Sequence, residues 1–160
     1  MVRVAGLKRR IATGIALKTA SGMQPTQVHS TVLTQSYEAM KTASKTFNDS
    51  ILPALVASGI EILRWEELTS VERDAMSTLF DEQVFPVLTP LAVDPSHPFP
   101  YISGLSLNLA VVVKNPNSGN ELFARVKVPP SLPRYIQVSP QRFVTLEDVM
   151  AGHLDKLFPG

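Results

Sequence analysis

The spacing of the apolar residues changes at Gly59, and this change constrains the fold more than any other feature of the sequence. Before Gly59 the apolar residues recur at steps of three and four, which places them on one face of a helix. After it, the stretches 107–114 and 121–128 alternate apolar residues with others, as strands do. We therefore expect an α+β protein, with a helical region over residues 1–59 and a small mixed α+β region over residues 60–160.

The helical region predicts two helices that pack as a truncated hairpin or incomplete bundle. The first covers residues 2–18, and its apolar stripe consists of Val4, Leu7, Ile11 and Ile15. The second begins at Pro25, because the first residue of a helix needs no N–H. Its apolar face consists of Leu33, Tyr37, Met40, Phe47, Ile51 and Leu55. Pro53 should bend the helix or break its last turn, and Gly59 should end it.

The region after Gly59 predicts short strands and helices around one antiparallel hairpin. A strand is expected over residues 60–65, and Thr69 and Glu72 form a capping box that opens a helix to about Val84. Five prolines exclude a helix from the segment 85–101. The other expected elements are the two hairpin arms, a further strand and a final helix, over residues 107–114, 121–128, 134–138 and 145–158.

The positive charge of the chain is concentrated at its start. The net charge is only +1, yet the first carboxylate is Glu38, and the preceding cations are Arg3, Lys8, Arg9, Arg10 and Lys18. At helical spacing Arg3 and Arg10 share one side, while Lys8 and Arg9 flank the apolar stripe. Such a segment indicates a solvated helix face, a surface for a polyanion, or a cleavable transit peptide over residues 1–23.

The residues alone predict no catalytic group and no set of metal ligands. The chain has no cysteine, which excludes a thiolate nucleophile and is compatible with a reducing cytoplasm. Its three histidines, His29, His97 and His153, are far apart and lack metal-ligand or nucleophile spacing. We expect His29 to face solvent and His153 to lie in or at the core. His97 should stabilise a turn between prolines, with a functional role in that loop as the alternative.

The sequence also excludes a phosphate-loop nucleotide site and a transmembrane helix. No glycine-rich phosphate loop followed by Lys-Ser/Thr is present. No apolar stretch approaches the roughly 20 residues that a transmembrane helix needs. We therefore expect a soluble protein without a transmembrane segment.

One long motif nevertheless resembles a known family. Residues 84–110, VFPVLTPLAVDPSHPFPYISGLSLNLA, closely resemble the head-domain signature of the large bacterial polyphosphate kinases. Residues 2–10 are similar to the helix that follows the family motif NLDEFF. Further matches occur in order and at similar spacing at residues 123–130, 132–134 and 157–160.

The resemblance implies a fragment of a phosphotransferase. Family members use ATP and Mg²⁺ to build polyphosphate reversibly, and their phosphorylated histidine, arginines and metal ligands lie in C-terminal domains that have no counterpart here. The resemblance therefore implies that residues 1–59 end the helical N-terminal domain and that residues 60–160 begin the head domain. It also implies that none of the three histidines is catalytic, and that the chain alone is inactive and binds no cofactor tightly.

The same resemblance implies partners and a location. Arg3, Lys8, Arg9 and Arg10 are the residues expected near nucleotide or polyphosphate. The head region is expected to pair subunits into a homo-oligomer, and no nucleic acid is expected as a partner. The parent enzyme would be cytoplasmic or peripheral to the membrane. The alternative is a non-enzymatic module that pairs subunits and binds a polyanion.

Overall fold

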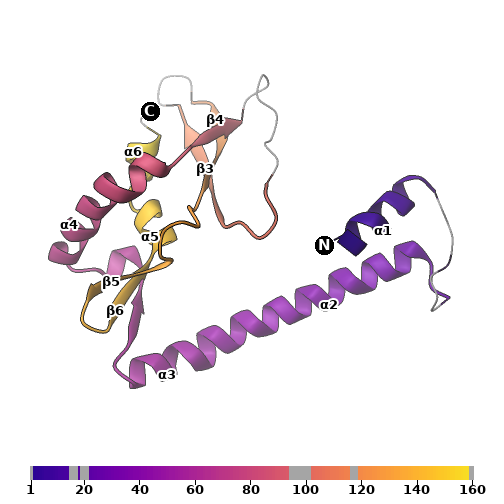
Figure 1. The fold of residues 1–160 in the computed structure, drawn as a ribbon, viewed down its shortest axis with the longest axis horizontal. Coiled ribbons are helices and arrows are strands. Elements are labelled where there is room, and N and C mark those ends of the chain that lie inside the picture. Colours follow the sequence, from indigo (N-terminus) through magenta and orange to yellow (C-terminus); the bar gives the residue numbers. More distant parts are fainter. Residues whose placement is uncertain (1, 15–17, 19–21, 94–101, 116–118, 159–160) are drawn as a thin grey trace. The chain divides into compact units, whose positions relative to one another are not determined.

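The chain divides into two compact units, Met1–Ala54 and Leu55–Gly160 (Figure 1). Helices and small sheets occur together, which confirms the expected α+β fold class. The predicted division of the chain between residues 59 and 60 into parts of two family domains stays a prediction. The computed structural model describes residues 2–14, 18, 22–93, 102–115 and 119–158.

The first unit pairs helix α1 (Val2–Ala12) with helix α2 (Pro25–Thr46). Pro25 takes the first position of α2 as predicted, and it is buried. The expectation that the first helix reaches Lys18 was wrong. Thr13 donates its hydroxyl to the carbonyl of Arg9 at 2.9 Å, and Gly14 adopts φ +68°. This left-handed conformation ends a helix, so α1 stops six residues early.

Most of the predicted apolar face of α2 is exposed in the described part of the chain. Tyr37 and Met40 keep 66% and 72% of their surfaces accessible. Helix α1 has 11 residues and α2 has 22, so at about 1.5 Å per residue α1 is half as long. A helix of that length covers only part of its neighbour, and the two helices form a short hairpin rather than a bundle.

The proline inside the second helix is accommodated without a break. Phe47–Ile51 form a π-turn, after which helix α3 (Leu52–Ala57) follows directly. Leu52 donates its N–H to the carbonyl of Phe47, one residue further back than in an α-helix. The wider turn makes room for Pro53, whose ring would otherwise meet the preceding turn. Gly59, at φ +82°, ends the helix as predicted, and the N–H of Ile60 bonds the carbonyl of Leu55 at 2.9 Å.

The second unit contains two three-stranded sheets. In one, β1 (Glu61–Leu63) pairs parallel with β6 (Arg142–Thr145), and β6 pairs antiparallel with β5 (Tyr135–Ser139). In the other, β4 (Glu121–Lys127) lies between β2 (Leu91–Val93) and β3 (Asn108–Lys114), with both pairings antiparallel. The predicted hairpin is therefore confirmed as β3 and β4. Strands β2 and β6 were not predicted.

The helix that the capping box opens reaches Val84 as predicted, since helix α4 (Ser70–Leu79) continues as a π-turn, Phe80–Val84. Two other predictions in this unit need correction. Phe85–Val87 then form a 3₁₀ turn where an extended chain was expected, because a proline early in such a turn need not donate an N–H. The final helix is divided into α5 (Leu146–Ala151) and α6 (Leu154–Leu157).

The break between α5 and α6 lies beside Trp65. Gly152 packs so closely on the indole that a Cβ at this position would overlap the ring. Trp65 itself belongs to a 3₁₀ turn, Trp65–Glu67, that follows β1. A residue without a side chain is therefore required where the two helices meet.

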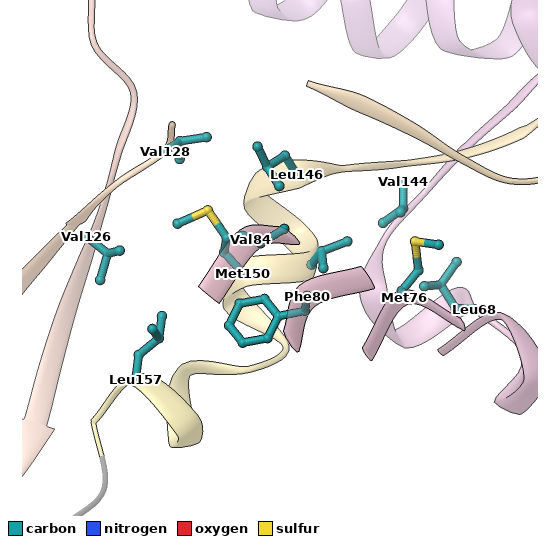
Figure 2. Packing of buried hydrophobic residues seen from close by; sticks show 11 residues of the cluster. Leu68, Met76, Phe80, Val84, Val126, Val128, Val144, Leu146, Met150 and Leu157 are labelled. Atoms are coloured by element: carbon teal, nitrogen blue, oxygen red, sulfur yellow. The ribbon is translucent and has the colours of Figure 1, made fainter. Parts of the chain in front are cut away.

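The core of the second unit lies between its helices and both sheets. Phe80, Val84 and Met150 lie together in Figure 2, with Val126 of β4 and Val144 of β6 to either side, and all five are fully buried. Burial of such side chains contributes roughly 1.5–3 kcal/mol each. This core fixes the loops and charged groups of the second unit that are described below.

Candidate functional site

The candidate polyanion surface is on α1. Arg3, Lys8, Arg9 and Arg10 are all exposed. Arg3 and Arg10 line one groove of about 440 Å³ between α1 and α2, which shows that they share a side of the helix as predicted. The remaining lining residues are Val4, Gly6, Leu7, Val28 and Val32.

The electrostatics of this groove are one-sided. Its lining contains two guanidinium groups and no carboxylate. Within the described residues, none of the four cations of α1 forms an ion pair. A structural role accounts for part of the charge, because Arg9 and Arg10 occupy the last turn of α1, where the helix dipole favours cations. A solvated face and a polyanion site therefore both fit this geometry.

His153 is a core residue, as predicted. It is 4% exposed, and its ring stacks on Phe80 with centroids 4.3 Å apart. Its Nδ1 lies 2.8 Å from the carbonyl of Val149, and its Nε2 lies 2.9 Å from the hydroxyl of Ser77. Both ring nitrogens are thus engaged, so His153 is not poised as a nucleophile.

The other two histidines do not join it. His29 was expected to face solvent, but it is half-buried on α2, and its Nε2 is inaccessible and has no partner among the described residues. His97 lies outside the described residues. Within the described ranges no three histidine, aspartate or glutamate side chains gather into a possible metal site.

Sequence reasoning missed a charged cluster at the start of α4. Glu72 closes the predicted capping box, accepting the N–H of Thr69 at 2.9 Å. It also accepts hydrogen bonds from Arg142 and from the hydroxyl of Ser139, the latter at 2.9 Å. Arg142 in turn pairs with Glu61. No signal in the sequence links these residues, because Ser139 and Arg142 come from the strands β5 and β6.

This cluster holds Glu72 as a carboxylate. Glu72 is only 8% exposed. The side-chain hydrogen bond from Arg142, helped by the N–H of Thr69, outweighs burial and lowers the pKa of Glu72 to about 2. The same contact raises the pKa of Arg142. A carboxyl group with so low a pKa cannot act as a proton donor near neutral pH, so Glu72 is a structural acceptor.

Two other acidic residues accept hydrogen bonds where a helical segment begins. Glu67 accepts the N–H of Arg64 at 2.6 Å. Asp148 accepts a hydrogen bond from the hydroxyl of Thr145 at 2.7 Å at the start of α5.

None of the helices in the described part of the chain is both long enough and apolar enough to cross a membrane.

Comparisons of the sequence and of the structure with known proteins all point to the same family. The polyphosphate kinase N-terminal domain matches residues 1–63, and the polyphosphate kinase middle domain matches residues 71–160. A polyphosphate kinase of Streptomyces coelicolor is 58% identical over 160 residues, covering 100% of this chain and 21% of that protein. A polyphosphate kinase of Mycobacterium tuberculosis is 46% identical over 175 residues, covering 100% of the chain and 24% of the relative.

A solved structure has the same fold. The crystal structure of polyphosphate kinase from Porphyromonas gingivalis superposes with a TM-score of 0.69 at 26% identity, covering 84% of this chain and 23% of that one. The chain therefore spans between about a fifth and a quarter of the length of these proteins.

Proposed function

The chain belongs to the polyphosphate kinase family, and we propose that it serves as the N-terminal and head region of an enzyme that transfers the γ-phosphate of ATP reversibly to polyphosphate. The observation that carries this proposal is that two domains of one family match in chain order, over residues 1–63 and 71–160. The 58% identity to the Streptomyces coelicolor enzyme supports it.

Within such an enzyme, the groove between α1 and α2 would present Arg3 and Arg10 to a phosphate chain. Phosphoryl transfer depends on positioned cations and on a nucleophile that faces the γ-phosphate. The described residues supply exposed cations on α1. Both ring nitrogens of His153 are engaged and the Nε2 of His29 is inaccessible, so neither described histidine is a free nucleophile. We therefore propose that this chain guides a polyanion and does not itself carry out the transfer. ATP and Mg²⁺ would be held by the whole enzyme and not tightly by this chain.

Incubation of the purified chain with Mg-ATP tests this division of labour. We expect neither acid-stable polyphosphate nor phosphohistidine, because the chemistry is assigned to other parts of the enzyme. Phosphohistidine on His29, His97 or His153, found by mass spectrometry, would contradict the assignment. A relative of full length provides the positive control.

A second function, pairing of subunits through the head region, is favoured by the outer face of the β3–β4 hairpin. Val112 of β3 is 65% exposed, and Ala110 on the same face is also exposed. These two residues give the face a small apolar area, between Asn108 and Lys114, that a second copy could cover. Sedimentation of the chain, compared with a Val112→Lys variant, tests it: the wild-type chain should form dimers and the variant should not.

A further inference from the structure

Three segments that are far apart in the sequence meet around one pocket of the second unit. The pocket has a volume of about 400 Å³ and is lined by residues 103–107, 127–130, Leu132, Arg134 and Leu146. The segment 103–107 belongs to the long family motif, while Lys127–Pro130 and Leu132–Arg134 belong to the two shorter matches. The motifs that reveal the family thus converge on a place to which the proposed function gives no role.

The pocket is cationic. Its lining contains Lys127 and Arg134 and no carboxylate. Glu147 orients Arg134. Its Oε1 accepts hydrogen bonds from the Nε of Arg134 at 3.0 Å and from the Nη2 at 2.7 Å. Among the described residues, neither the Nη1 of Arg134 nor the ammonium group of Lys127 has a partner. Two donors therefore remain for an anion, although Glu147 offsets part of the charge of Arg134.

The loop of residues 103–107 in this lining is held in a specific conformation. The hydroxyl of Ser106 donates to the carbonyl of Ser103 at 2.7 Å and accepts from Nδ2 of Asn108 at 3.0 Å. Leu105, between these serines, adopts φ +59° and is fully exposed. Burial does not explain this left-handed leucine, and backbone strain of this kind gathers at binding sites. Asn108 pairs with Lys127 across the hairpin, so the fixed loop and the cation lie in register.

The remaining lining is apolar and limits the class of ligand. Leu107, Pro129, Pro130 and Leu132 form this part of the wall. Pockets of roughly 300–1,000 Å³ with an apolar lining and a few polar groups are typical of small-molecule sites. A guanidinium group, an ammonium group and the hydroxyl of Ser103, all in the lining of the pocket, can donate hydrogen bonds to the oxygens of a phosphate group.

We propose that this pocket binds the phosphate group of a small ligand, with Lys127 and Arg134 as its cationic contacts and Ser103 as a hydroxyl donor. The phosphate could come from a nucleoside phosphate, whose base would rest on the proline wall, or from a short inorganic phosphate chain. This site shares no residue with the α1 groove, and the proposal made here does not depend on the function proposed for that groove.

Site-resolved NMR titration of the isotope-labelled chain tests this assignment. The probes are ADP, tripolyphosphate and adenosine, and the chain carries Gln at positions 3, 8, 9 and 10 so that α1 does not contribute. We expect the amide signals of Ser103, Ser106 and Lys127 to shift with ADP, with tripolyphosphate or with both, but not with adenosine. Shifts with ADP alone identify a nucleoside phosphate, and shifts with tripolyphosphate show that the phosphate chain suffices.

Lys127→Gln should weaken this binding by about tenfold, the effect of losing one charge-assisted contact. Lys114→Gln, at the other end of β3, is the matched control and should leave the affinity unchanged. Lys127 has no partner among the described residues, so its replacement should not disturb the fold. The proposal is overturned if neither phosphate probe shifts these signals, if adenosine shifts them equally, or if the two lysine variants behave alike.

Discussion

Arg142 clamps Glu72 across 70 positions of the chain, with Nε 2.9 Å from Oε1 and Nη2 3.3 Å from Oε2. The two hydrogen bonds join the first turn of α4 to strand β6. Because the carboxylate also caps the helix through Thr69, a single side chain both starts α4 and fastens it to the sheet. This coupling makes the stability of the second unit sensitive to acid.

Glu72 predicts a specific acid transition. Its pKa is lowered from 4.5 to about 2 in the folded chain. Its contribution to stability is therefore fully present above pH 4.5 and is lost as the pH falls toward 2. In denaturant titrations, the difference in unfolding free energy between the wild-type chain and Glu72→Gln should shrink steadily through this window. A difference that is the same at all pH values would contradict the ionised clamp.

Gly152→Ala should destabilise the second unit, because the new Cβ would overlap the ring of Trp65. Overpacking of this kind costs about 1–3 kcal/mol, measurable by denaturant unfolding. Trp65→Phe makes room at the same place. The double variant should therefore lose less stability than the two single variants together, and strict additivity would show that the ring is not the obstacle.

Leu105→Asn should stabilise the chain slightly. Leu105 has φ +59° and no buried surface to lose. The left-handed conformation costs a residue such as leucine about 1–2 kcal/mol, whereas asparagine tolerates it. We expect a gain of about 0.5–1 kcal/mol in thermal or denaturant unfolding. Leu105→Ala keeps the conformational cost and serves as the control, so an equal gain there would contradict strain at this position.

Long polyphosphate should bind weakly to the chain through α1, with an affinity that falls steeply as salt is added, because phosphate binding releases condensed counterions. Replacing Arg3, Lys8, Arg9 and Arg10 with Gln should abolish binding and leave the helical circular dichroism unchanged, since Gln is a comparable helix former. If the groove is the path, Arg3→Gln with Arg10→Gln should weaken binding more than Lys8→Gln with Arg9→Gln.

Lys41→Gln with Lys45→Gln provides the control for that experiment. Both lysines are exposed on α2 and lie outside the groove lining. Binding that survives the fourfold change, or that the α2 control removes equally, would leave α1 as a solvated face.

Local patterns predicted the elements that rest on local physics. The box of Thr69 and Glu72, the stop at Gly59 and the alternating arms of the hairpin each require only neighbouring residues. Strand β6 was not predicted, because Arg142–Thr145 is only four residues long and its strand structure depends on pairing with the distant β1. The turn that ends α1 was missed because the apolar spacing continues past Gly14 to Ile15, and spacing carries no information about backbone φ.

The candidate sites divide in the same way. The exposure of the four cations of α1 followed from helical spacing and the lack of nearby acids. The clamp on Glu72 and the half-buried position of His29 depend on packing between distant segments, which the pattern of one segment cannot show. The motif segments around Lys127 and Arg134 were visible in the sequence, but only the fold brings them to one pocket.

The parallel pairing of β1 with β6 also orders the events of folding. Glu61 and Arg142 meet across 81 positions, whereas β3 ends at Lys114 and β4 begins at Glu121. Closing a long loop costs more entropy and takes longer than forming a hairpin. The hairpin can therefore form while the chain is still emerging from the ribosome, but β1 must wait until Arg142–Thr145 have been synthesised. Until then the edge of β1 has no partner strand, and an open strand edge can pair with another chain.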